Sequence, residues 1–310
     1  MGVSRHKPND AISRLCALAG EKDPRNAIIT TARRTLLEYG GTEMPLNVRE
    51  LCEFRKMRVY EQYLADCDAR LTPLREGYIV EVDKAHGASR QNFSLCHEIG
   101  HTFFLDSPSE RVGAEFSCSP IVNQENNKIE YLCNVAATEL LMPEGDFQRV
   151  TSDFRPSLAS ARMVAAAFGT SLETTLLRIL ELDLWQCCLL CARHERQITS
   201  GGELDWEGWT PSVTLGYGFL AVMGVIFELE SILSGEGYGV NFLRRLAIAG
   251  EKARIVMPGL TMPVFLESYS CSLRSADRYY VLVVFEHRGR ASKENYEFRL
   301  LDHENVLELS

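Results

Sequence analysis

The chain has 310 residues, of which 45% are hydrophobic and 24% are charged, with 22 glycines and 11 prolines. This length and composition predict an ordinary globular protein of two domains and exclude disorder and fibres. The 33 basic and 42 acidic residues give a net charge of −9, which argues against nucleic-acid binding through a broadly basic surface. Residues 1–182 hold 21 basic against 25 acidic residues and residues 183–310 hold 12 against 17, so neither half is a basic module.

The N-terminus has no apolar core of the kind that a signal peptide needs, so we expect a cytoplasmic protein. Ten cysteines are scattered along the chain, several of them inside apolar runs, and are expected to be reduced thiols. The longest uncharged run, 208–227, opens with polar and turn residues and carries glycines. It is expected to be a core strand or buried helix, and we expect no membrane association.

Hydrophobic periodicity predicts a helical lead-in and a small sheet before residue 90. Two helices are expected between residues 10 and 40, where Gly40 and Gly41 end the second. A short helix and two strands are expected to follow, at 48–54, 57–60 and 77–82.

Phe93, Cys96, Ile99 and Phe103 repeat every three or four residues, which predicts an amphipathic helix from about residue 90 to about 106. Residues 107–128 lose this periodicity and are expected to form a long loop. An Ala- and Leu-rich helix is expected over 129–142, ended by Pro143.

Residues 157–182 have a helix-turn-helix outline, with a turn at Gly169 and Ser171 as the N-cap of the second helix. The basic residues in or just before this segment are only Arg155, Arg162 and Arg178, so phosphate binding would be weak. We expect these helices to be the packed end of the first domain, with no direct DNA binding; a DNA-binding role is the alternative.

After residue 182 the pattern changes to strands, so we place a domain boundary near residue 183. The strands are expected at 185–192, 219–226, 279–285 and 296–301, with a helix at 227–233. The predicted fold class is therefore α+β, with a first domain at 1–182 and a smaller α+β domain at 183–310. Cys187, Cys188 and Cys191 contain one C-x-x-C pair, which we interpret as buried strand thiols, the alternative being a metal or redox site.

The sequence His97-Glu98-Ile99-Gly100-His101 has the H-E-x-x-H pattern on the predicted amphipathic helix. Four residues at 3.6 per turn place both imidazoles on one helix face, where they can bind a single Zn²⁺. Glu98 would then lie beside the metal-bound water and act as its general base.

A catalytic zinc needs a third protein ligand from elsewhere in the chain. Glu110, Glu115 and Glu125 lie in the predicted loop, whereas Glu130 opens a helix and is our candidate. Asn134, one turn on, either orients Glu130 or a histidine or simply binds water. Glu139 adjoins a packing segment and is left out of the site.

Three separated segments resemble the ImmA/IrrE family of zinc metallopeptidases. The first joins Gly77–Val82 to Arg90–His101, where the family reads Arg-x-x-Phe-Thr-Leu-Ala-His-Glu-Leu-Gly-His. The second is Glu130–Asn134, for the family's Glu-x-x-Ala-Asn, and the third is Ala136–Pro143, with its Leu-Leu-Met-Pro ending. The departures from the pattern are Ser94 for Thr, Cys96 and Cys133 for Ala, and Ile99 for Leu.

The resemblance covers about residues 25–182 and implies a compact gluzincin-like, zincin-type core. His97, His101 and Glu130 would bind zinc, and Glu98 would be the base. By analogy with zincins, the strand at 78–82 would lie at the sheet edge and pair with an extended substrate through Tyr78, Ile79 and Val80. Some family members carry a GAF-like sensor where this chain has residues 183–310, so a sensor or target-binding domain is expected there.

The predicted function is that of a zinc-dependent endopeptidase, with Zn²⁺ as cofactor, although two histidines and a carboxylate also suit Mn²⁺ or Fe²⁺. The family implies a protein substrate, often a helix-turn-helix repressor, in stress response or mobile-element regulation. The alternatives are a regulator that binds DNA or a repressor without cleaving it, its metal site being structural or vestigial, and the toxin half of a toxin–antitoxin pair. The sequence predicts no oligomeric state.

Overall fold

The computed structural model describes the backbone of residues 8–41, 43–105, 116–117, 124–185, 187–198, 204–215, 253–257, 260–273, 276–285, 299–301 and 306–308. Side chains are described within 11–41, 43–105 and 127–185. The chain divides into two compact units, one of residues 1–147 with 164–174 and one of residues 148–163 with 175–310. Because residues 148–174 alternate between the units, the boundary near 183 stays a prediction.

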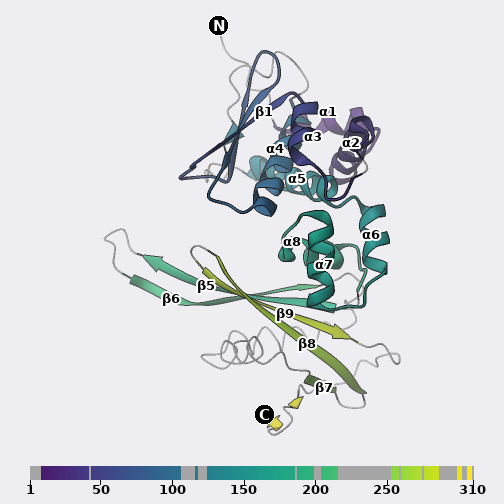
Figure 1. Cartoon of the computed structure of the whole chain (residues 1–310), viewed down its shortest axis with the longest axis vertical. Coiled ribbons are helices and arrows are strands. Elements are labelled where there is room, and N and C mark those ends of the chain that lie inside the picture. The colour runs from purple at the N-terminus through teal and green to yellow at the C-terminus, as the bar shows by residue number, and fades with distance from the viewer. Residues whose placement is uncertain are drawn as a thin grey trace. The chain divides into compact units, whose positions relative to one another are not determined.

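The first unit begins with the three expected helices, α1 (Pro8–Ala19), α2 (Pro24–Tyr39) and α3 (Val48–Phe54) (Figure 1). Asp23 caps α2 by accepting a hydrogen bond from the Asn26 backbone at 2.9 Å, and Pro24 opens the helix. Gly40 ends it with a φ of 73°, a left-handed conformation that glycine adopts without steric cost.

A four-stranded sheet follows, in the order β1-β3-β2-β4. Its strands are β1 (Met57–Gln62), β2 (Ala69–Pro73), β3 (Tyr78–Asp83) and β4 (Phe116–Ser117). β1 runs parallel to β3, while β2 runs antiparallel to β3 and β4. The sequence did not predict β2, because Leu71 is the one large apolar side chain in it, nor β4, which lies inside the predicted loop.

The edge position expected for Tyr78, Ile79 and Val80 is wrong. β3 lies inside the sheet, where Tyr78 aligns with Met57 of β1 on one side and with Pro73 of β2 on the other. Both sides of the strand are therefore paired, and an extended substrate cannot add to it. Tyr78 and Val80 are also buried, which is typical of a core strand that does not meet a substrate.

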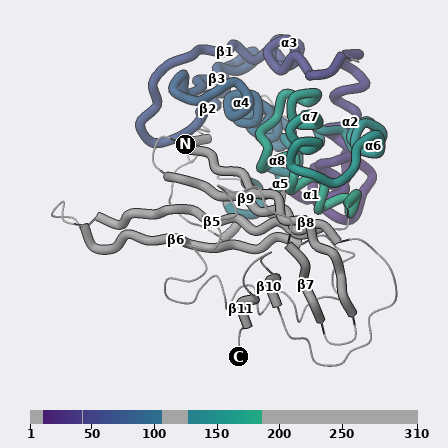
Figure 2. The backbone as a smooth tube through the Cα atoms, turned by 60° about the horizontal axis from the view of Figure 1, so that its bottom comes forward, coloured from purple at the N-terminus to yellow at the C-terminus, as the bar shows by residue number. Residues whose placement is uncertain are grey.

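The next helix, α4 (Ala88–Thr102), lies across the sheet and packs against β2, β3 and α3 (Figure 2). Every residue from Ser94 to Thr102 is buried, and Leu95, Cys96 and Ile99 have no exposed surface. A helix that is buried on all sides carries polar side chains only where they meet other polar groups. That requirement applies to His97, Glu98 and His101.

Helix α5 (Gln124–Leu141) packs against α4 and is longer than expected. It starts at Gln124 because its first turns are polar and exposed at Asn127 and Lys128, so hydrophobic periodicity did not mark them. Pro143 ends it as expected, but a further helix, α6 (Glu144–Ser152), begins at once and was missed. The buried Phe147 of α6 packs on Phe168, with 5.2 Å between ring centroids.

The helix-turn-helix outline is confirmed as α7 (Leu158–Phe168) and α8 (Leu172–Glu181), which bend by 102°. Ser171 caps α8 by accepting a hydrogen bond from the Thr174 backbone at 3.1 Å. A recognition helix must expose the face that enters a DNA groove, but Thr175, Leu176, Arg178, Ile179 and Leu180 of α8 are buried. This burial favours the interpretation of packed helices.

The second unit contains a seven-stranded antiparallel sheet in the order β11-β10-β7-β8-β9-β5-β6. Its strands are β5 (Cys187–Ile198), β6 (Leu204–Leu215), β7 (Ala253–Met257), β8 (Leu260–Leu273), β9 (Ala276–Phe285), β10 (Arg299–Leu301) and β11 (Val306–Glu308). The strands expected at 185–192, 279–285 and 296–301 correspond to β5, β9 and β10. The strand at 219–226 and the helix at 227–233 lie outside the described residues.

The whole chain is of mixed α+β class, as expected, while the GAF-like character of residues 183–310 stays a prediction. Among the described residues, no single helix has the length and apolarity to cross a membrane. α7 and α8 meet that limit only when they are taken together across their bend.

Candidate metal centre

Two helices supply the polar side chains that the sequence singled out. α4 carries His97, Glu98 and His101, with 8%, 1% and 2% of their surface exposed, and α5 carries Glu130, whose side chain is 39% exposed. The histidines are one helical turn apart, so their rings project from the same face of α4. The site is therefore deep on the α4 side and open to solvent on the α5 side.

The possible ligand atoms of His97, His101 and Glu130 lie close together. The Nε2 atoms of His97 and His101 are 3.1 Å apart. One carboxylate oxygen of Glu130 lies 3.0 Å from Nε2 of His97, and the other lies 3.5 Å from Nε2 of His101. Ligands about 2.05 Å from a tetrahedral zinc ion are about 3.3 Å from one another. The observed separations bracket this value, so the residues fit a single metal ion.

The charge state of Glu130 follows from its surroundings. Partial burial alone would raise the pKa of its carboxyl, but hydrogen bonds from His101 and His97 outweigh the burial and lower it well below the usual range. Glu130 is therefore an anion at neutral pH, which is the form that binds a cation.

Asn134 lies beside a histidine, which is one of the positions that the sequence allowed. Its side-chain oxygen lies 2.9 Å from Nδ1 of His97, one turn along α5 from Glu130. An amide oxygen can only accept, so Nδ1 carries a proton and donates it to Asn134. Nε2 faces Glu130, and a bound metal ion would take the place of the proton on Nε2. The contact is with a histidine and not with Glu130.

Glu98 has no equivalent partner. Its Oε2 is buried and makes no hydrogen bond to any residue that the structure describes. Desolvation by burial raises the pKa of this carboxyl, while His101 and His97 oppose the shift. A buried carboxylate oxygen without a partner is costly in a core, so its retention beside the two histidines suggests a ligand or water as its partner.

The other carboxylates considered for the site are elsewhere or undescribed. Glu139 is buried and accepts a hydrogen bond from Nε of Arg33 at 2.7 Å, so it forms a structural ion pair, in agreement with its exclusion. Glu110 and Glu115 lie outside the described residues, and the side chain of Glu125 is not described.

Cys133 is the residue that sequence reasoning missed. Its sulfur and one ring nitrogen of each of His97 and His101 all lie within 4.8 Å of one another, and all three residues are buried. Two signals pointed to it: Cys133 follows Glu130 by three residues, and it stands where the related family has alanine. Cys16, Cys52, Cys67, Cys96 and Cys133 are not in disulfides.

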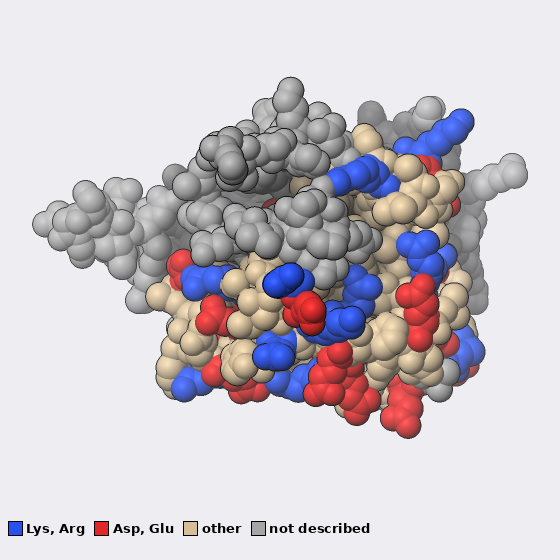
Figure 3. Space-filling view, turned by 90° about the horizontal axis from the view of Figure 1, so that it is seen from above, with Lys and Arg blue, Asp and Glu red and all other residues tan. Residues whose placement is uncertain are grey.

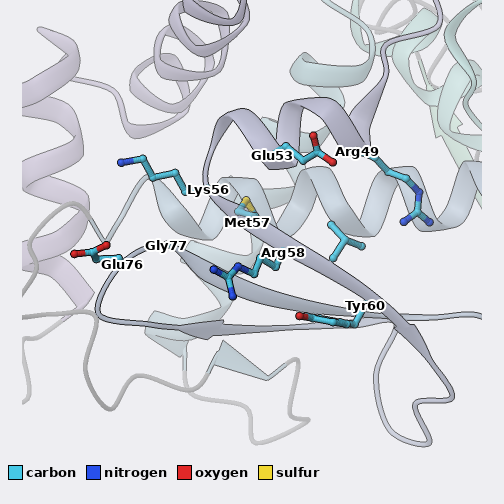
Figure 4. Close-up of a pocket in the computed structure, with 9 residues that line it drawn as sticks. Arg49, Glu53, Lys56, Met57, Arg58, Tyr60, Glu76 and Gly77 are labelled. Atoms are coloured by element: carbon cyan, nitrogen blue, oxygen red, sulfur yellow. The ribbon is translucent and has the colours of Figure 1, made fainter.

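A cavity of about 780 Å³ lies elsewhere in the first unit, between α3 and β1 (Figure 4). Its charged lining residues are Arg49, Glu53, Lys56, Arg58 and Glu76, and none of the candidate metal-binding residues lines it.

Charges are also mixed on the face of the molecule seen in Figure 3, where described Lys and Arg side chains alternate with Asp and Glu.

Comparison with known proteins supports the family resemblance. Residues 52–180 match the model of a peptidase family described as the IrrE N-terminal-like domain. This segment contains α4, α5 and all of the candidate site residues. Among solved structures, a Mycobacterium tuberculosis transcriptional regulator is similar, with 11% sequence identity and a TM-score of 0.46, over 90% of this chain and 81% of that chain. No curated protein matches the sequence.

Proposed function

Residues 52–180 belong to the IrrE N-terminal-like domain family, and on this basis we propose that the protein is a zinc-dependent endopeptidase. The observation that carries the proposal is the convergence of His97, His101 and Glu130, whose donor atoms lie 3.0 to 3.5 Å apart. These three residues would hold the metal, and two histidines with one carboxylate leave a tetrahedral ion one open position.

When bound, zinc supplies Lewis acidity, which lowers the pKa of a coordinated water to about 7 and polarises a peptide carbonyl. The chain's own residues prepare this chemistry. Asn134 would hold the His97 ring through Nδ1, so that Nε2 is the nitrogen that meets the metal, and His101 presents its Nε2 on the same helix face. Glu130 adds the negative charge that the cation requires.

Glu98 is the proposed general base. Its buried Oε2 is free of hydrogen bonds to described residues, and burial raises its pKa above that of an exposed glutamate, which favours proton uptake. It would accept the proton of the attacking water and return it to the leaving amine. Burial also keeps bulk water from competing for the same oxygen.

The substrate is proposed to be a protein, and a helix-turn-helix repressor in stress response or mobile-element regulation is the candidate. This part rests on the ImmA/IrrE resemblance and the family match. Cleavage of such a repressor would switch on the genes that it controls.

The second candidate is a regulator that binds its partner without cleavage and whose metal is structural. One observation favours it: the sulfur of Cys133 lies within 4.8 Å of a ring nitrogen of each histidine, which makes it a candidate for a fourth ligand. The buried, unpartnered Glu98 oxygen favours catalysis, because a purely structural site has no use for a base.

Metal content and cleavage, measured together, test the proposal. Mass spectrometry should find about one zinc per chain in wild type and in Glu98→Gln, and little in His97→Ala or Glu130→Ala. Glu125→Ala, which removes another carboxylate of α5, is the matched control and should keep the metal. A purified helix-turn-helix repressor from the same genome should be cleaved by wild type and not by Glu98→Gln. Wild-type metal content in Glu130→Ala would overturn the ligand set.

A further inference from the structure

Cys133 of α5 lies against Gly100 of α4, where the two helices approach each other closely. A Cβ atom added to Gly100 would lie 3.0 Å from Cα of Cys133 and 3.2 Å from its Cβ. A larger residue at position 100 would require Cys133 to shift by a few tenths of an ångström. Because Gly100 stands between His97 and His101 in the chain, Cys133 faces the segment of α4 that carries both rings.

The same helix face of α5 presents Glu130, Cys133 and Asn134, since residues three and four apart are neighbours on a helix. Glu130 and Asn134 both contact His97. Cys133 has no exposed surface, and its sulfur and one ring nitrogen of each histidine lie within 4.8 Å of one another. In a tetrahedral site, a sulfur at 2.3 Å and a nitrogen at 2.05 Å from zinc are about 3.6 Å apart, compared with at most 4.8 Å here.

A second buried thiol shows that burial alone does not produce this arrangement. Cys96 adjoins His97 on α4 and has no exposed surface, but its interacting neighbour is Cys52 of α3. Burial raises the pKa of the Cys96 thiol well above its usual value. Both cysteines replace alanine of the related family, yet only Cys133 joins the histidine cluster.

We propose that Cys133 is a fourth ligand of the metal that His97, His101 and Glu130 hold, so that the resting site is closed. The inference rests on the proposed function for the first three ligands. Binding forms a metal–sulfur bond and breaks the S–H bond, and the proton leaves to solvent. Thiolate is a preferred ligand of zinc, and an ion with four protein ligands has no position for water or a peptide carbonyl.

The protein is then a latent peptidase that this side chain regulates. The metal becomes available to a substrate only when the sulfur is displaced, by the substrate itself or by a thiol-directed reagent. Alanine at position 133, the residue of the related family, would leave the fourth position permanently open.

The test uses the full-length protein loaded with Co²⁺, which reports sulfur ligation through a thiolate-to-cobalt absorption band in the near ultraviolet. Wild type and Cys96→Ala should show the band, and Cys133→Ala should lose it while it still binds one cobalt per chain. X-ray absorption of the zinc-loaded proteins should find one sulfur neighbour in wild type and in Cys96→Ala, and none in Cys133→Ala. Circular dichroism controls for folding, and Cys133→Ser gives a second variant of closer size.

The outcomes separate the two proposals. One metal per chain with no sulfur neighbour in wild type would overturn the fourth ligand and leave the three-ligand site intact. A sulfur band that survives in Cys133→Ala would overturn the assignment to Cys133. Loss of the band together with the same cleavage rate in wild type and Cys133→Ala would contradict latency. A sulfur-ligated metal with no cleavage in any variant would sustain the ligand and overturn the peptidase.

Discussion

The α4–α5 and α7–α8 pairs were both singled out by a sequence motif, but their polar residues have different surroundings. In α7–α8 the polar groups serve the fold: Ser171 caps α8, and Arg178 pairs with Glu181 at 2.8 Å. In α4–α5 the polar side chains converge on one another, and Oε2 of Glu98 is left without a described partner. The difference teaches that convergence of buried polar groups, more than a motif outline, identifies a site.

Glu139 makes the same point within α5. It is as deeply buried as Glu98, with 1% of its surface exposed, but it accepts hydrogen bonds from Arg33 at 2.7 Å and from the Glu144 backbone at 3.3 Å. A buried carboxylate that supports the fold is compensated, whereas Glu98 lies next to two imidazoles that are themselves grouped around an acidic side chain.

The largest effect is expected at the base. Glu98→Gln keeps the size of the side chain but cannot accept a proton, so we expect the cleavage rate to fall by about 10² to 10⁴. Metal content should match wild type, because Glu98 is not a proposed ligand. The measurement is the single-turnover cleavage rate with metal analysis of the same sample. Wild-type rates would remove Glu98 from the mechanism and weaken the contrast with Glu139.

Close packing of the two helices is tested at Gly100. In Gly100→Ala the new methyl group would collide with Cys133 and Ala136 at 3.0 to 3.2 Å, a cost of about 1 to 3 kcal/mol that exceeds the gain in helix propensity. We expect a lower free energy of unfolding in urea and weaker metal binding.

Gly145→Ala in α6 is the matched control, because a Cβ there meets nothing within 4 Å. It should leave stability unchanged or raise it by up to about 1 kcal/mol. Equal destabilisation by both substitutions would show that the approach of α5 to α4 at Gly100 is not special.

Orientation of His97 is tested at Asn134. Asn134→Ala removes the acceptor for Nδ1 of His97 and should weaken zinc binding about 10- to 100-fold, as removal of such outer partners does elsewhere. A competition titration with a zinc chelator measures the change. Asn134→Asp, which keeps an acceptor oxygen, should restore most of the zinc affinity. An unchanged zinc affinity in Asn134→Ala would show that the amide does not orient His97.

The smallest effect on stability and function is expected in the α7–α8 pair. Ser171→Ala removes the cap of α8 and should cost about 1 kcal/mol of stability with no effect on metal binding. Thermal unfolding and zinc titration of the same variant provide the two readouts. A loss of metal affinity here would contradict the view that α7–α8 serves only the fold.

Much of the site follows from local sequence. The spacing of His97 and His101 fixes a common helix face, and Glu130 stands out because its helix repeats on one side. Asn134 could be placed near the proposed metal ligands from its spacing. Its contact with His97, and not with Glu130, depends on the rotation of α5 against α4, which no local pattern encodes.

The sequence predictions that were wrong or incomplete concern features that local patterns do not encode, such as the pairing of strands distant in the sequence. Whether β3 lies inside the sheet depends on β2, a short strand with a single large apolar side chain, so the role assigned to Tyr78, Ile79 and Val80 could not be checked from the sequence. The start of α5 and the whole of α6 were missed because exposed polar turns carry no periodicity. Cys133 was visible only as a departure from alanine until the structure brought it next to the two rings.

The central claim is that α4 and α5 together bind one metal ion through His97, His101 and Glu130. Anomalous diffraction at the zinc absorption edge, from crystals of the zinc-loaded protein, tests it most directly. The account predicts one strong peak about 2.0 to 2.2 Å from Nε2 of both histidines and from a carboxylate oxygen of Glu130. A peak that has no contact with Glu130, or no peak between the two helices, would contradict it.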